Sequence, residues 1–284
     1  MTEKMKLFAL FGNPVGHSLS PLMHNAAYEA MGLAARYEAF AVPDAETALR
    51  RMRETGIEGA SVTIPLKTAI MSHLDEIDDA SRAIGAVNTL WVREGRIFGG
   101  NTDWTGFTRS LKDRFDLRGK TFAVLGSGGA ARAAVFGILK EGGNPVVVHR
   151  NPATGEVLAR EFHCPSRPIS EFEKVEAHCL VNATPAGMFP NAEGIPVPPQ
   201  GLSRFQWVMD LVYNPLHTKL LREAQAAGCG VITGLPMLIH QGAEQIRIWT
   251  GKEAPFDLMS RVAEEELLRR SGRRGDSRRV ESPT

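Results

Sequence analysis

The chain has 284 residues, 43% of them hydrophobic and 23% charged, which is typical of a soluble globular protein with one large or two medium domains. The formal net charge of +1 creates no global field that would favour nucleic acid or acidic partners. Three widely spaced cysteines, Cys164, Cys179 and Cys229, indicate reduced thiols in a cytoplasmic protein and neither a disulfide framework nor a metal site. We expect no signal peptide, and no apolar run approaches the roughly 20 residues that span a membrane.

The first hundred residues predict an alternation of strands and helices, which indicates an α/β unit. We expect strands over 7–11, 37–42 and 59–64, and helices over 20–31, 44–55, 66–74 and 78–84. Ser20 followed by Pro21 is typical of a helix cap and first turn, whereas Asp44 and Gly56 are expected to begin and end the next helix. Residues 88–92 and 96–99 predict a strand pair around Glu94-Gly95.

A glycine turn follows the next predicted strand, at 121–125. The pattern Gly126-x-Gly128-x-x-Ala131 and a small-residue helix to about Lys140 fit the dinucleotide fingerprint, in which a pyrophosphate lies on the helix N-terminus. An ordinary strand–turn–helix can carry the same glycines, but here strand, turn and helix come in the required order. Further strands over 145–149, 180–183, 207–210 and 230–233, with helices over 156–162 and 218–227, extend this unit.

The sequence therefore predicts an α/β fold with two domains. Residues 1–106 would form a substrate-binding, catalytic domain, and residues 107–236 a Rossmann-like dinucleotide-binding domain. Helices within 237–268 are expected to pack back on the first domain. The basic tail, 269–284, is expected to be disordered and solvated, in preference to a nucleic-acid-binding role. The sequence leaves the oligomeric state open, and a homodimer is the state to be tested.

The strand after the glycine turn ends in His149-Arg150-Asn151. Folds of this kind that prefer NAD place an acidic residue there, on the ribose hydroxyls, whereas an arginine accommodates the 2′-phosphate of NADP. The absence of an acid and the presence of Arg150 favour NADP, although an arginine at this place can also be an ordinary surface charge.

Four polar clusters lie outside the nucleotide unit, and each of them alone would more often be a turn or a surface segment. Two hydroxyls at a helix N-terminus, those of Ser18 and Ser20, suit a carboxylate. Lys67 follows the strand that carries Thr63, at the edge of a sheet where α/β folds bind ligands. The other two clusters are 85–89 and 100–103.

These stretches together resemble the shikimate dehydrogenase family, in order and at similar spacing from about Phe8 to Leu268. The matching segments are Asn13–Pro21, Ser61–Lys67, Gly85–Thr89, Gly100–Asp103, Gly126–Ala130, Asn182–Met188, Asp210–Tyr213, Gly234–Ala243 and Trp249–Gly251. The resemblance implies an NADP-dependent oxidoreductase that interconverts 3-dehydroshikimate and shikimate, a step of aromatic amino-acid biosynthesis.

The resemblance also implies the site residues. Lys67 and Asp103 match the catalytic pair, and which of them transfers the proton stays open. The substrate carboxylate would be bound by Ser18 and Ser20 with help from Tyr213, and the substrate hydroxyls by Thr63, Lys67, Asn88, Asp103 and Gln241. The cofactor would contact Asp79, Gly126, Ser127, Gly128, Gly129, Ala130, His149, Arg150, Asn151, Thr154, Leu211 and Gly234.

The chain departs from the family pattern at two places that matter for specificity. Ser61 stands where the family usually has Asn, so a direct substrate contact from this position is doubtful or runs through water. Thr154 stands where a second basic residue often follows, which predicts weaker discrimination of NADP against NAD. Two alternatives stay open: a quinate/shikimate dehydrogenase that uses NAD, and a homologue that only binds ligand, although the latter would be expected to lack the Lys67–Asp103 pair.

Overall fold

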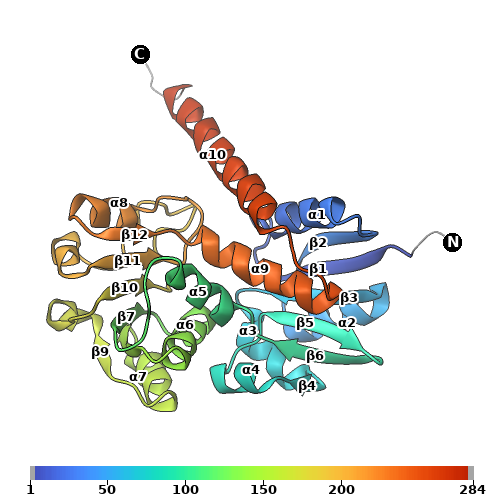
Figure 1. Ribbon diagram of the computed structural model, residues 1–284, viewed down its shortest axis with the longest axis horizontal. Coiled ribbons are helices and arrows are strands. Elements are labelled where there is room, and N and C mark those ends of the chain that lie inside the picture. The colour runs from blue at the N-terminus through green and yellow to red at the C-terminus, as the bar shows by residue number, and fades with distance from the viewer. Residues whose placement is uncertain (1–3, 281–284) are drawn as a thin grey trace.

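A computed structural model describes residues 4–280, and their side chains up to residue 271. These residues form two six-stranded sheets covered by helices, with helix α9 (Leu235–Thr250) lying along the centre of the molecule (Figure 1). The predicted two-domain α/β architecture is confirmed. Among the described residues, no helix combines the length and the apolar character needed to cross a membrane.

The first sheet has the strand order β2-β1-β3-β5-β6-β4 and is mixed. β1 is parallel to β2 and β3, whereas β5 is antiparallel to both β3 and β6. The β5–β6 pair turns at Glu94-Gly95, as expected, and both turn residues have positive φ. The strands are β1 (Lys6–Gly12), β2 (Ala35–Ala41), β3 (Ile57–Val62), β4 (Glu76–Ile77), β5 (Thr89–Arg93) and β6 (Arg96–Gly100).

The helices of this part follow the expected order, with one local difference. They are α1 (Ser20–Ala30), α2 (Ala45–Thr55), α3 (Leu66–Ala69), the 3₁₀ segment η1 (Ile70–His73) and α4 (Asp79–Ile84). The single helix expected over 66–74 is therefore a short α-helix that tightens into a 3₁₀ turn. Asp44 caps α2, since its side chain accepts a 2.7 Å hydrogen bond from the Thr47 amide, and Gly56 ends that helix at φ +69°.

The second sheet is parallel throughout, with the order β12-β11-β10-β7-β8-β9. Its strands are β7 (Thr121–Leu125), β8 (Asn144–His149), β9 (Ser166–Pro168), β10 (Cys179–Asn182), β11 (Trp207–Asp210) and β12 (Gly230–Ile232). The connecting segments are α5 (Asp103–Lys112), α6 (Gly129–Lys140), α7 (Pro152–Glu161), η2 (Ile169–Lys174), η3 (Pro199–Arg204) and α8 (Lys219–Ala226). The strand order reverses between β7 and β10, the point at which such sheets bind ligands.

The two last helices pack on the first sheet. On α9, Trp249 stacks on Phe8 of β1 with ring centroids 5.0 Å apart, and its indole N–H donates to the Leu90 carbonyl of β5. Helix α10 (Phe256–Val280) buries Met259 and Leu267 in the same core as residues of α1. Residues 235–267 and the first sheet thus share one apolar core.

Helix α10 is longer than the sequence predicts. The residue pattern indicates an end near Arg269, whereas α10 continues to Val280 and its outer end projects away from both sheets (Figure 1). Adding residues to an existing helix requires less free energy than nucleating a new one. The segment is also rich in arginine, which is a good helix former. Residues 281–284, which belong to the tail expected to be disordered, lie outside the described residues.

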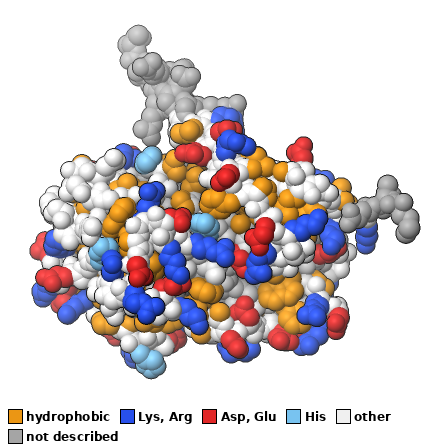
Figure 2. Space-filling model, in the orientation of Figure 1, with side chains coloured by type: hydrophobic (Ala, Val, Ile, Leu, Met, Phe, Trp, Pro, Cys, Tyr) orange, Lys and Arg blue, Asp and Glu red, His pale blue; other side chains and the backbone are white. Residues whose placement is uncertain are grey.

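The surface agrees with the small net charge. Figure 2 shows Lys and Arg side chains interspersed with Asp and Glu over the face that it presents, with no extended area of one sign.

Candidate active site

A cavity of about 340 Å³ lies between the carboxyl ends of the two sheets. The first sheet and its helices contribute polar side chains, among them Lys67, Asn88 and Asp103. The second sheet contributes mainly small and apolar residues that follow β10, β11 and β12, such as Ala183, Leu211 and Gly234, together with Ala130 on α6. The cavity thus has one wall of polar side chains, from the first sheet, and an opposite wall of small and apolar residues, from the second sheet.

The polar wall is built around an ion pair. Lys67, in α3 just after β3, lies with its Nζ atom 2.5 Å from Oδ2 of Asp103, the first residue of α5. Their side chains are only 17% and 6% exposed. The Asp103 amide donates to the side chain of Asn101 at 2.9 Å, which fixes the start of α5. A pair shielded this far from water keeps its geometry better than a surface salt bridge does.

Asn88 holds the other carboxylate oxygen. Its Nδ2 atom donates to Asp103 Oδ1 at 2.8 Å and lies 3.3 Å from Oε1 of Gln241, and its Oδ1 atom accepts from the Thr102 amide at 2.7 Å. The structure therefore brings Lys67, Asn88, Asp103 and Gln241 together, although they lie far apart in the sequence.

Ser61 belongs to a second chain of hydrogen bonds behind this wall. Its Oγ atom accepts from the Tyr37 hydroxyl at 2.6 Å and donates to Oε1 of Gln245 at 2.7 Å. The Nε2 atom of Gln245 donates in turn to Thr89 Oγ1 at 3.0 Å and to the Asn88 carbonyl at 3.2 Å. Ser61 lines the cavity, but its hydroxyl is engaged from both sides.

Gln245 supports the polar wall from behind, and no sequence motif indicated it. It is buried and lies one helical turn after Gln241 on α9, so that Gln241 lines the cavity and Gln245 lies behind the polar wall. That spacing was the available signal, since two amides at i and i+4 on the face of a helix that carries Met237, Ile239 and Ile246 indicate a buried polar contact.

The N-terminus of α1 forms a separate corner of the cavity, with Ser18, Ser20 and Tyr213. Ser20 was expected to cap α1, but it is the first helical residue, and its amide donates to the Ser18 hydroxyl at 3.1 Å. Tyr213 hydrogen-bonds to Ser18. Burial raises the pKa of Tyr213, while that hydrogen bond and the nearby charge of Arg270 lower it. Hydroxyls at a helix N-terminus suit an anionic group.

The opposite wall fits a dinucleotide. Gly126 has φ +112°, a conformation that favours glycine, and a Cβ atom on Gly128 would meet nothing within 4 Å. Helix α6 begins at Gly129, and no described side chain caps it, so its first N–H groups are available to a phosphate. A Cβ atom on Gly129 would lie 3.3 Å from the Lys67 side chain, which places the turn directly against the polar wall.

Gly234 also permits a close approach of backbone. A Cβ atom there would lie 2.5 Å from the Leu211 carbonyl oxygen, so only glycine fits at the start of α9. Ser127 and Thr154 connect the glycine turn to α7 through their hydroxyls, 2.8 Å apart. Thr63 lines the cavity next to Lys67.

Some of the expected cofactor residues lie elsewhere. The imidazole of His149 is buried against Gly155 and does not reach the cavity, which leaves only its backbone for a ligand. The Asn151 side chain accepts from the Ala153 amide at 3.0 Å and caps α7. Arg150 is exposed at the end of β8, and Asp79 is exposed on α4, outside the cavity lining.

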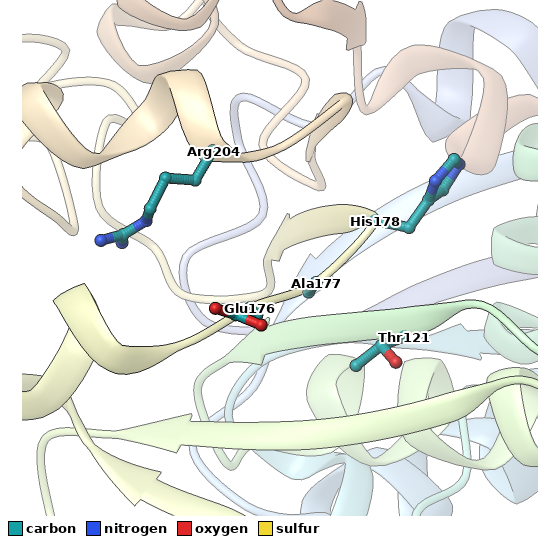
Figure 3. Close-up of a pocket in the computed structure, with 5 residues that line it drawn as sticks. All are labelled: Thr121, Glu176, Ala177, His178 and Arg204. Atoms are coloured by element: carbon teal, nitrogen blue, oxygen red, sulfur yellow. The ribbon is translucent and has the colours of Figure 1, made fainter.

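A second hollow lies at the opposite edge of the parallel sheet, beside Thr121, Glu176, Ala177, His178 and Arg204 (Figure 3). The labelled side chains do not converge in this view: Arg204 and His178 point in opposite directions. The Arg204 guanidinium is already bound to the carbonyls of Glu173 and Phe172. Within the described residues, no group of three or more His, Cys, Asp or Glu side chains could hold a metal ion.

The glycine turn at the point where strand order reverses, set against a buried Lys–Asp pair, defines a two-domain, dinucleotide-dependent oxidoreductase. Comparison with known proteins agrees. The family model described as the shikimate dehydrogenase substrate binding domain matches residues 10–90, and that of the shikimate 5'-dehydrogenase C-terminal domain matches residues 234–264.

Individual relatives match over nearly the whole chain. The shikimate dehydrogenase (NADP(+)) of Moorella thermoacetica is 45% identical over 94% of this chain and 95% of its own length. That of Methanopyrus kandleri is 43% identical over 91% and 94%. The structure of shikimate 5-dehydrogenase from Thermus thermophilus in complex with NADP(H) and shikimate has a TM-score of 0.85 at 41% identity, and the match covers 92% of this chain and 99% of that one. The chain belongs to the shikimate dehydrogenase family.

Proposed function

We propose that the protein is an NADP-dependent shikimate dehydrogenase, which reversibly reduces 3-dehydroshikimate to shikimate in the biosynthesis of aromatic amino acids. The observation that carries the proposal is the buried Lys67–Asp103 pair, which lies directly against the glycine turn. The curated relatives that carry this activity in their names support it.

The cofactor would lie on Gly126–Ala130 and the N-terminus of α6, with Leu211 and Gly234 at the nicotinamide end and Arg150 and Thr154 near the 2′-phosphate. When bound, it supplies a hydride to the carbonyl carbon of the substrate. The fit rests on the open space at Gly128, the uncapped start of α6 and the close backbone approach at Gly234.

The substrate would be oriented by groups at the two ends of the polar wall. Ser18, Ser20 and Tyr213 would bind its carboxylate at the N-terminus of α1, while Asn88, Gln241 and Thr63 would bind its ring hydroxyls. Orientation of this kind, fixed before the reaction, removes much of the entropic part of the barrier.

Lys67 would provide the proton. As the carbonyl becomes an alcohol, its oxygen gains negative charge, and the Lys67 ammonium can stabilise that charge and donate a proton to it. The Asp103 carboxylate holds the ammonium in place, and Asn88 keeps the carboxylate from rotating away. In the oxidative direction, neutral Lys67 accepts the same proton from the substrate hydroxyl.

An assay of the wild-type protein tests the proposal. Reduced nicotinamide is followed by absorbance with shikimate or quinate as the substrate and NADP or NAD as the cofactor. We expect the highest kcat/KM for shikimate with NADP, and a discrimination against NAD that is modest because Thr154 replaces a second cation. A higher kcat/KM for quinate with NAD would favour the quinate/shikimate dehydrogenase alternative, and no turnover in any combination would favour a ligand-binding homologue.

The domain boundaries and the surroundings of the protein belong to the same proposal. We assign residues 1–106 and 237–268 to the substrate domain and 107–236 to the cofactor domain. A cytoplasmic location fits the three free cysteines. A homodimer without affinity for nucleic acid is the expected state, and light scattering with and without added DNA measures both points.

A further inference from the structure

Helix α10 reaches the edge of the active site. Its buried stripe, formed by Met259, Ala263 and Leu267 at successive turns, packs with residues of α1. Arg270 lies close to one turn beyond Leu267 on the same side, and it therefore points towards the loop that precedes α1.

Two contacts fix the Arg270 side chain. Its Nη1 atom donates to the His17 carbonyl at 2.8 Å, and its Nε atom donates to Oε1 of Glu266 at 2.7 Å. The side chain is 23% exposed, which is low for an arginine. The guanidinium is thus tied to its own helix by one bond and to the active-site loop by the other.

The His17 carbonyl belongs to the peptide unit that leads into Ser18. Ser18 and Ser20 line the cavity at the N-terminus of α1, and Tyr213 completes that corner. The Arg270 charge also reaches Tyr213, whose pKa it lowers against the effect of burial. A fixed cation behind hydroxyl groups at a helix N-terminus adds to the field that favours an anion there.

We propose that Arg270 is a positioning residue for the substrate carboxylate: it holds the loop that carries Ser18 and places a positive charge behind the carboxylate-binding corner. The proposal rests on the function proposed above. It gives the segment after residue 268, whose composition predicts a solvated tail, a part in substrate binding.

The neighbouring Arg269 is a matched control. It is bound to the same Glu266, with Nε 2.6 Å from Oε2 and Nη2 2.7 Å from Oε1, but its side chain is 48% exposed. Within the described residues it makes no hydrogen bond to the loop before α1. Loss of Arg269 removes the same charge and a comparable ion pair without touching the active-site loop.

The test compares Arg270→Met, Arg270→Lys and Arg269→Met with the wild type, using shikimate and its neutral methyl ester as substrates. In Arg270→Met we expect the KM for shikimate to rise on the order of tenfold, with kcat and the KM for NADP nearly unchanged. The effect on the methyl ester should be much smaller, because the ester carries no charge. Arg270→Lys should recover part of the loss, and Arg269→Met should behave as wild type. Thermal denaturation checks that each variant is folded.

Three results would overturn the proposal: an unchanged KM in Arg270→Met, equal effects on shikimate and its ester, or an equal effect of Arg269→Met. Calorimetric titration of shikimate into each protein separates this test from that of the proposed function. Wild-type protein that binds shikimate without turning it over contradicts the function, while the comparison of affinities still decides the role of Arg270. Wild-type protein that neither binds nor turns over shikimate contradicts both.

Discussion

His24 in α1 is a buried titratable group whose effect on stability can be calculated. Its ring stacks on Tyr37 at 4.2 Å, and neither ring nitrogen has a hydrogen-bond partner among the described residues. Burial lowers the pKa of His24 from 6.5 to about 3. The folded protein therefore keeps the ring neutral at a pH where the unfolded chain protonates it.

The sign and size of the effect follow from linkage. Below about pH 6.5 the unfolded state binds a proton that the folded state does not, so the free energy of unfolding falls with falling pH until about pH 3. Between about pH 7.5 and about pH 4.5 this single group removes about 3 kcal/mol of stability. Asp210 acts in the opposite sense, because burial raises its pKa to about 6.

The variant His24→Phe isolates the contribution, since it keeps the aromatic stack and removes the titration. Urea denaturation of both proteins at a series of pH values gives the free energy of unfolding. We expect the difference between variant and wild type to shift by about 3 kcal/mol in favour of the variant as the pH falls over that range. The effects of Asp210 and of any overpacking by the larger ring cancel in this comparison, because neither changes the His24 titration. Parallel curves would refute the reasoning.

Two further predictions concern the walls of the cavity. Gly234→Ala places a Cβ atom 2.5 Å from the Leu211 carbonyl oxygen, so the backbone must shift. We expect the KM for NADP to rise on the order of tenfold, with a smaller change in the KM for shikimate. Equal changes in the two KM values would contradict a role of Gly234 on the cofactor side. Gln245→Leu removes the amide that bridges Ser61, Thr89 and the Asn88 carbonyl. We expect a loss of stability of about 2–4 kcal/mol by chemical denaturation, and a lower kcat because the backbone of Asn88, whose side chain binds Asp103, loses this support. A variant as stable and as active as wild type would exclude the network from both roles.

Local patterns predicted the architecture well. Alternating apolar runs and turn residues located most strands, and the cap at Asp44 and the stop at Gly56 both hold because such signals depend only on neighbouring residues. The two-residue strand β4 and the three-residue strand β9 were missed. Strands this short carry no periodicity of their own and exist only through pairing with a neighbouring strand.

The site was predictable where motifs carry it and unpredictable where tertiary contacts do. Lys67, Asn88 and Asp103 meet as the motifs indicated. The strand end at His149 gave no sign that its ring would be buried against Gly155, because that contact comes from the packing of α7. The contact of Arg270 with the His17 carbonyl depends on how α10 packs against α1, and no local sequence pattern encodes that packing.

The most direct test of the account is the turnover of Lys67→Met with shikimate and NADP, measured beside calorimetric binding of each. Methionine keeps most of the apolar stem of Lys67 and removes the group that carries the proton. We expect kcat to fall by about 10²–10⁴-fold, with the affinity for NADP and the thermal stability close to those of wild type. A kcat within tenfold of wild type would contradict the assignment of Lys67, and with it the central claim that the buried Lys67–Asp103 pair carries the chemistry.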